Sequence, residues 1–212
     1  MNKVLLSLLL WSAPSLAQEA NPVTYQLLVG QSQIYVQVFK DPDTMGAGLS
    51  HDHVIMATGW SGTVTWDEAN PAACRVDIRV PVRGLIVDEP STRTAVGYES
   101  MLSDGQRRDV RENMLKRDQI DGDSHPNITF TANRCTGSGG SYQVHGRMSI
   151  RGQSQSMVAP MEIRVLNGEL LARGSVAANQ TAFGIEPFSA MFGQLKNQDE
   201  MRFTIVVKGS AD

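Results

Sequence analysis

The segment that decides the fold is Arg75–Arg83, which reads Arg-Val-Asp-Ile-Arg-Val-Pro-Val-Arg. Apolar side chains occupy every second position, and charged residues or proline occupy the positions between them. A period of two is typical of a β-strand with one apolar and one solvated face, as antiparallel sheets commonly have. The segment therefore predicts an antiparallel strand whose Val76, Ile78 and Val80 face the interior.

The same alternation recurs along the chain. It is present in Asn127–Ala132, Tyr142–Ile150, Met161–Val165 and Met201–Lys208. Asn167 and Gly168 form a strong hairpin signal between two such segments, because both residues tolerate a positive φ angle. Val29–Ser32 is expected to bend the first strand back on itself. We count eight to ten strands, spaced as in an up-and-down barrel or a sandwich.

One segment interrupts the strands. From Ser103 to Leu115 the pattern is helical, and Ser103 and Gln106 fit a capping box at its start. Its apolar positions are few, so we expect one short helix on the surface or capping one end of the fold. This helix lies inside a long connection that begins near Asp88.

The N-terminus predicts export. A positive start and a short apolar run, Val4–Trp11, are followed by small residues at Ser15 and Ala17, which place a cleavage site after Ala17. The run is too short to cross a bilayer as a helix. We expect residues 1–17 to be a signal peptide and residues 18–212 to form one soluble domain outside the cytoplasm, without stable membrane insertion.

Charge and motifs exclude several classes of protein. The net charge is −3, and the basic residues between Arg107 and Arg117 are interspersed with acidic ones, unlike the basic surface of a nucleic-acid-binding protein. Asp88 and Glu89 are interpreted as solvated loop residues. The sequence contains no phosphate loop, nucleophile elbow or dinucleotide fingerprint. No catalytic residue and no cofactor are therefore predicted.

Cys74 and Cys135 lie at the ends of predicted strands. In the oxidising compartment that export implies, they are expected to form a disulfide rather than remain free thiols. In the chain-entropy model, a bridge closing a loop of about sixty residues stabilises the fold by about 3–4 kcal/mol. A thiol catalyst needs a histidine partner and a lowered pKa, and no motif supplies that partner.

His51 and His53 form the most distinctive polar cluster. On a strand, this spacing places both imidazoles on one face, which is how a zinc or copper site can begin. His125 lies in a loop and His145 on the predicted solvated face of a strand, so no third ligand is evident. A local hydrogen-bond network is favoured over a metal site, and a contact with the polar end of a ligand is the remaining alternative.

The small number of large side chains favours a hollow interior. Aromatic residues are 6% of the chain, whereas valine, alanine, glycine and methionine are common at the inward positions. Small inward residues leave space for a ligand, although a tightly closed barrel uses them too. A filled barrel that acts through protein partners therefore remains an alternative.

Five segments occur in an order that is typical of a known family. They are Leu49–His53, Trp60–Asp67, His125–Phe130, Tyr142–Gly152 and Phe183–Ile185. In this order they resemble the YceI-like family of bacterial periplasmic proteins, which bind polyisoprenoids or other long-chain lipids. The resemblance spans nearly all of the mature chain. It implies an all-β fold, an extended antiparallel lipocalin-like barrel of about eight strands whose apolar tunnel holds the ligand.

The resemblance also implies roles for particular residues. His51 or His53 corresponds to the family's strand histidine, and Phe183 and Ile185 correspond to its late pocket wall. The inward residues expected to line the tunnel are Val76, Ile78, Val80, Ile128, Phe130 and Phe203. The short helix would serve as a lid or plug at one end of the barrel.

The resemblance implies a non-enzymatic carrier whose partner is a long-chain lipid or isoprenoid, and a homodimer is compatible with it. The chain departs from the family pattern in its second histidine, in its two cysteines and in a less aromatic Met114–Ile120 segment. These departures leave the identity of the ligand open. A metal- or redox-linked protein that uses His51 and His53 is the alternative function.

Overall fold

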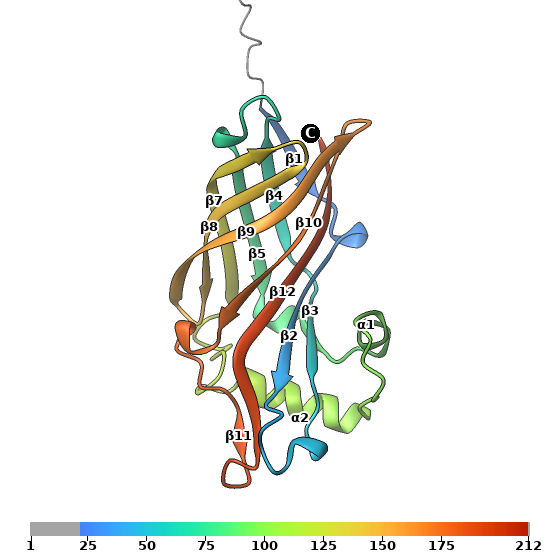
Figure 1. Ribbon diagram of the computed structural model, residues 1–212, viewed down its shortest axis with the longest axis vertical. Coiled ribbons are helices and arrows are strands. Elements are labelled where there is room, and N and C mark those ends of the chain that lie inside the picture. The colour runs from blue at the N-terminus through green and yellow to red at the C-terminus, as the bar shows by residue number, and fades with distance from the viewer. Residues whose placement is uncertain (1–21, 212) are drawn as a thin grey trace, which may run out of the picture.

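The alternating segments form a twelve-stranded antiparallel sheet that closes on itself as an elongated barrel (Figure 1). The computed structural model describes residues 22–211, so the predicted signal peptide, residues 1–17, lies outside the described residues. Eight strands close the barrel in the order β1-β4-β5-β7-β8-β9-β10-β12, and β12 pairs back with β1. The all-β, lipocalin-like fold expected from the sequence is confirmed.

Each alternating segment of the sequence corresponds to a strand, although β7, β9 and β12 extend well beyond the predicted segments. The strands are β1 (Val23–Leu27), β2 (Gln33–Lys40), β3 (His53–Ala57), β4 (Ser61–Trp66), β5 (Arg75–Pro81), β6 (Leu85–Val87), β7 (Asn127–Ser138), β8 (Ser141–Ile150), β9 (Gln153–Leu166), β10 (Glu169–Asn179), β11 (Ser189–Ala190) and β12 (Leu195–Ala211). The helices are α1 (Pro90–Ala95) and α2 (Asp104–Leu115), and the 3-10 turns are η1 (Val29–Gln31), η2 (Ala47–Leu49), η3 (Pro71–Ala73), η4 (Val82–Gly84) and η5 (Thr181–Phe183).

Early in the chain, three long strands are each interrupted: β1 and β2 by η1, β3 and β4 by a short loop, and β5 and β6 by η4. In the upper half of Figure 1, β1 pairs with β4 and β4 with β5. In the lower half, β2 pairs with β3 and β3 with β6. Both β1 and β2 run antiparallel to β12. The expected reversal at Val29–Ser32 is therefore wrong. The turn η1 only interrupts the strand, because Ser32 Oγ donates to the Leu28 carbonyl at 2.7 Å and β2 continues in the direction of β1.

One end of the barrel, called the disulfide end below, is held together by a disulfide between the residue before β5 and the neighbouring strand β7 and by an aromatic contact across the interior. Cys74 and Cys135 form the expected disulfide. The Trp66 and Tyr142 rings meet edge to face with centroids 4.7 Å apart. Because these aromatics come from β4 and β8, which are not neighbouring strands, their contact spans the barrel. The hairpin signal at the same end is also confirmed, since Asn167 and Gly168 have φ angles of 53° and 81° between β9 and β10.

The opposite end, called the helix end, is covered by α2 (Figure 1). The predicted capping box is present: Ser103 Oγ accepts from the Gln106 amide, and Gln106 Oε1 accepts from the Ser103 amide. Val110 and Met114 of α2 pack against the barrel core. The sequence therefore predicted this helix correctly, whereas α1, which begins with Pro90 as its first residue, was not expected.

Candidate binding cavity

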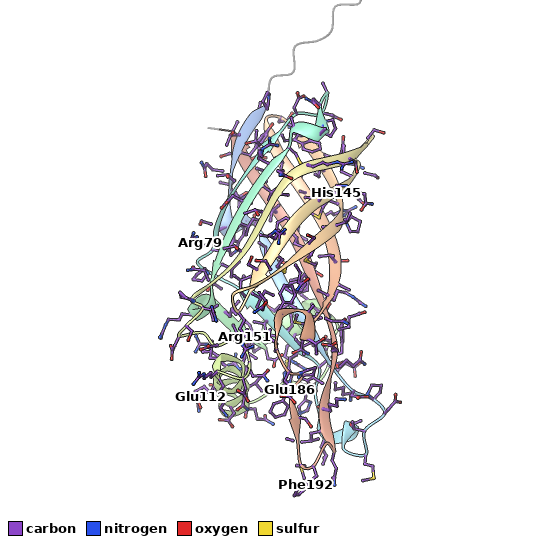
Figure 2. All side chains as sticks on the ribbon, turned by 90° about the vertical axis from the view of Figure 1, so that its left-hand side faces the viewer. Arg79, Glu112, His145, Arg151, Glu186 and Phe192 are labelled. Carbon is purple, nitrogen blue, oxygen red and sulfur yellow. A yellow bond between two sulfur atoms is a disulfide. The ribbon has the colours of Figure 1, made fainter. Side chains whose placement is uncertain are left out.

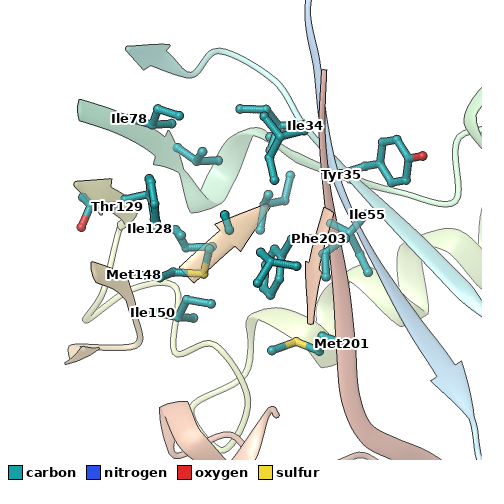
Figure 3. Close-up of a pocket in the computed structure, with 18 of the residues that line it drawn as sticks. Ile34, Tyr35, Ile55, Ile78, Ile128, Thr129, Met148, Ile150, Met201 and Phe203 are labelled. Carbon is teal, nitrogen blue, oxygen red and sulfur yellow. The ribbon is translucent and has the colours of Figure 1, made fainter. Parts of the chain in front are cut away.

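A cavity of about 280 Å³ runs through the interior of the barrel. Its lining extends from Trp66 and the disulfide at one end to Val110 and Met114 of α2 at the other. Figure 3 shows aliphatic, thioether and aromatic side chains from several strands, among them Met148 and Phe203, around this space. The volume is near the lower end of the range for small-molecule sites, which is roughly 300–1,000 Å³. A slender apolar chain fits such a space better than a bulky ring system.

Most of the predicted site residues line this cavity. They come from β3, β5, β7, the segment before β11, and β12, and they are His53, Val76, Ile78, Val80, Ile128, Phe130, Ile185 and Phe203. The alternation that predicted the strand Arg75–Pro81 thus placed its apolar face on the interior side. Their contact with a ligand stays a prediction.

Phe183 and His51 are not among the cavity-lining residues. Phe183 lies in η5 and is fully buried beside Met148 and Met201, in the second apolar cluster at the helix end. Gly184 follows it with a φ angle of 69°, a left-handed conformation that glycine adopts readily. Phe183 therefore supports the cavity wall from behind.

The histidine pair does not share a strand as the sequence suggested, because β3 begins at His53 and His51 lies in the irregular segment before it. Asp52, between them, accepts a hydrogen bond from the Lys40 amide at 2.9 Å, which holds this segment against the end of β2. Burial, the neighbouring His53 and nearby cations together lower the pKa of His51. No group of three metal-binding side chains occurs within residues 22–211.

His53 instead belongs to a buried charged network with Asp88 and Arg93. The imidazole Nδ1 lies 2.6 Å from Asp88 Oδ2, and Asp88 Oδ1 accepts from Arg93 at 2.7 Å and from the Val54 amide at 3.0 Å. Asp88 directly follows β6 and has a φ angle of 51°. The side chains of Asp88 and Arg93 are both fully buried. The interpretation of Asp88 as a solvated loop residue is therefore wrong.

The network keeps Asp88 ionised. Burial on its own would raise the pKa of Asp88, but the hydrogen bond and charge of His53, the Val54 amide and Arg93 together outweigh it, so this pKa lies below its usual value. Arg93 is in turn held by the Ser100 carbonyl at 2.8 Å and stacks over Tyr98 at 5.0 Å. An ionised carboxylate can only accept hydrogen bonds, so the Nδ1–H of His53 donates to it.

This arrangement leaves the second imidazole nitrogen of His53 available to the cavity. His53, Ile55 and Ala57 alternate along β3 and all three line the cavity, which places the imidazole on the interior side. Within the described part of the chain, no side chain or carbonyl hydrogen-bonds its Nε2. With Nδ1 protonated, a neutral His53 presents Nε2 as an acceptor, and a protonated His53 presents it as a donor.

The polar side chains of the lining gather at the helix end. Apart from His53, they include Asn113 of α2, Gln119, Gln180 and Asn197, whereas the disulfide end is lined by Trp66, Val144 and Leu170. The cavity is therefore polarised along the barrel axis. Sequence reasoning missed Asp88 and Arg93 because a loop acid and a helix arginine carry no periodic signal. The Asp-Glu-Pro start of α1, which turns Arg93 back toward Asp88, was the available cue.

Comparison with known proteins gives the same architecture. The YceI-like domain family matches residues 30–208. The barrel is similar to the crystal structure of BcnA from Burkholderia cenocepacia, with a TM-score of 0.65 and 13% identity over 86% of this chain and 98% of that one. It is also similar to the YceI protein of Campylobacter jejuni, with a TM-score of 0.55 and 14% identity over 74% of this chain and 84% of that one. No curated protein matches the sequence.

Proposed function

We propose that this chain, which belongs to the YceI-like family, is a carrier that holds one long apolar chain, a polyisoprenoid or a related lipid, along the axis of its barrel. The match over most of the chain confirms the family expected from the five ordered segments. The observation that carries the proposal is the apolar cavity that runs from Trp66 to α2. Burial of an apolar chain there stabilises the complex by about 25 cal/mol per Å² removed from water.

The polarity of the lining supports a single orientation of the ligand. The tail lies toward the apolar disulfide end, and the polar head lies at the helix end near His53. Hydroxyl, carbonyl and phosphate groups are all compatible with Nε2, since it accepts a hydrogen bond in the neutral imidazole and donates one in the protonated form. The buried Asp88–Arg93 pair fixes the orientation of the ring, so that the contact is preorganised.

Export to the periplasm is part of the same proposal. The disulfide between Cys74 and Cys135 indicates an oxidising compartment. Residues 1–17 have the composition of a signal peptide. Within residues 22–211, no helix is both long and apolar enough to cross a membrane.

The proposal is tested by filling the cavity. Ala159 of β9 lines it, whereas the adjacent Val158 points outward and is exposed, so Ala159→Phe and Val158→Phe are a matched pair on one strand. We expect native mass spectrometry of the wild-type protein, purified gently from a host with membranes, to show a bound lipid mass. In Ala159→Phe the fraction of protein with bound lipid should fall at least about tenfold, because the phenyl ring occupies the space of the lipid chain. In Val158→Phe this fraction should stay as in the wild type.

Thermal unfolding of both variants provides the control for folding. An empty wild-type protein contradicts the proposal, and so does equal loss of the lipid from two folded variants. Solvent extraction of the wild-type protein then identifies the lipid class.

A further inference from the structure

Two loops meet at the outermost point of the helix end. One connects β2 to β3 and contains η2, and the other is the hairpin between β11 and β12. The Gly46 amide donates to the Gln194 carbonyl at 3.0 Å, and the Asp41 amide donates to the Lys196 carbonyl at 2.8 Å. These hydrogen bonds join the loops into one projection, and Figure 2 shows Phe192 at its end.

Four large apolar side chains on this projection point into solvent. Their exposed fractions are 89% for Met45, 74% for Leu49, 57% for Met191 and 108% for Phe192. We call these four residues the apolar tip. Single exposed apolar residues are common on protein surfaces, but a contiguous group marks an interaction site.

The backbone conformation of the hairpin also indicates that the exposure of Met191 and Phe192 has a functional reason. Met191 and Phe192 have φ angles of 51° and 57°, in the left-handed region that favours glycine and asparagine. Such positions are usually occupied by small polar residues, which would also keep the turn soluble. Here two bulky apolar residues occupy them instead, at a conformational cost that persists at functional sites.

The apolar tip lies near the helix end of the cavity. Phe188, which precedes β11, lines the cavity and is also partly exposed. The Asn197 amide donates to its carbonyl at 2.9 Å, and Asn197 lines the cavity as well. Phe188 therefore borders both the solvent and the end of the cavity where the polar head of the ligand is proposed to lie, close along the chain to Met191 and Phe192 of the apolar tip.

We propose that the apolar tip inserts into the surface of a lipid bilayer and docks the helix end of the barrel there. A stable protein–protein interface buries roughly 800 Å² on each side over a broad surface, whereas the apolar tip is a narrow projection at the end of the barrel (Figure 2). A bilayer accepts a small convex wedge, because apolar groups bury themselves about 5–10 Å into the boundary between head groups and acyl chains.

The charges beside the tip indicate that apolar insertion dominates. Lys40 and Lys196 are accompanied by Asp41 and Asp43 on the same loops, so the projection has no excess of positive charge. Lys40 Nζ is bound to the Ala47 carbonyl at 3.1 Å. Docking should therefore occur on neutral phosphatidylcholine and change little with salt, unlike binding by a basic patch.

The role of docking in loading rests on the proposed carrier function. A lipid that leaves the bilayer tail first enters the barrel through the helix end, and its polar head then stays at that end. This direction agrees with the polar lining around His53 and Gln119.

Flotation with phosphatidylcholine vesicles tests the docking. We expect the wild-type protein to float with the vesicles and Met191→Ser/Phe192→Ser to lose at least about tenfold in partitioning. The control is Val158→Ser/Leu166→Ser, which removes two exposed apolar side chains, with exposed fractions of 49% and 53%, from the barrel wall and its far end. It should bind vesicles as the wild type does. Equal losses in both double variants, or a wild type that does not float, would overturn the docking.

A fluorescent reporter provides a second measurement that does not depend on stability. Trp60 and Trp66 are buried, so Phe192→Trp adds a solvent-exposed tryptophan that brominated lipids should quench on docking. The absence of quenching overturns the proposal. The carrier function and the docking can be contradicted independently. A protein that binds vesicles but contains no lipid supports docking and contradicts the carrier function. A protein that contains lipid but does not bind vesicles supports the carrier function and contradicts docking.

Discussion

The two ends of the barrel are closed by different structural features. The disulfide end is held by a covalent bond and by the Trp66–Tyr142 contact across the interior. The helix end is built from broken strands, a separate helix, a buried charged network and an exposed apolar tip. The first arrangement resists opening, whereas the second combines the polar side chains of the cavity lining with the apolar tip. We infer that stability and function are assigned to opposite ends of one barrel.

The buried charged network of His53, Asp88 and Arg93 illustrates this division between the two ends. Replacing a buried ion pair with apolar residues of similar volume is often neutral or stabilising, so Asp88 and Arg93 are weak evidence for stability on their own. Their position beside the cavity explains why they are buried there, because together they orient His53 toward the cavity. Among residues 22–211, no comparable buried network of ion pairs lies at the disulfide end, whose lining includes Trp66, Val144 and Leu170.

The largest expected effect separates the two roles of the network. Asp88→Ala leaves the Arg93 guanidinium buried without a partner and should lower the free energy of unfolding by about 3–5 kcal/mol. Urea denaturation measures this loss. The double variant Asp88→Leu/Arg93→Met should recover most of it, because no buried charge remains.

A surface pair provides the control for this prediction. Glu162 and Arg173 lie 2.7 Å apart but are exposed, so Glu162→Ala should cost no more than about 1 kcal/mol. If Asp88→Ala costs as little as Glu162→Ala, the network does not stabilise the helix end. If the double variant recovers stability and still binds lipid normally, His53 does not need its orientation fixed.

Removing the disulfide should have the second largest effect. Cys74 and Cys135 are 61 residues apart in the sequence. Cys74→Ala/Cys135→Ala should lower the free energy of unfolding by about 4 kcal/mol, because the unfolded chain regains the freedom of that loop. The bound lipid should be retained in the folded variant, because the polar contacts lie at the other end. Native mass spectrometry at a temperature well below unfolding measures this. Loss of the lipid would contradict the division between the two ends.

The sequence also predicts the structure of the disulfide end better than that of the helix end. Alternation, the Asn167–Gly168 turn and the two cysteines carry local signals, and they predicted the strands, the hairpin and the disulfide correctly. At the helix end, only α2 has such a signal, through its capping box at Ser103. The sequence therefore predicted the barrel wall better than the features that interrupt it.

The remaining features depend on contacts between distant segments. Asp88 follows a three-residue strand and meets His53 only because β6 pairs with β3. The turn η1 looked like a reversal because glycine and serine occur in both turns and bulges, and only pairing with β12 distinguishes them. His51 and His53 are two residues apart in the sequence, but β3 begins only at His53, so His51 lies outside the strand.

The smallest expected effect is a loss of stability in acid that originates at the helix end. The pKa of Asp88 is lowered in the folded protein, so its contribution is complete above the unfolded value of about 4 and is lost as the pH falls through the folded pKa. The loss should be smaller than that of Asp88→Ala, because a protonated carboxyl keeps an oxygen that can accept from Arg93. The difference in unfolding free energy between the wild type and Asp88→Leu/Arg93→Met should therefore stay constant from pH 5 to about pH 4 and change below it. His51, whose pKa is also lowered, reduces stability as the pH falls below about 6.5, which is a separate window. A difference that stays flat down to pH 3 would mean that the ionised form of Asp88 is not what holds His53 against the cavity.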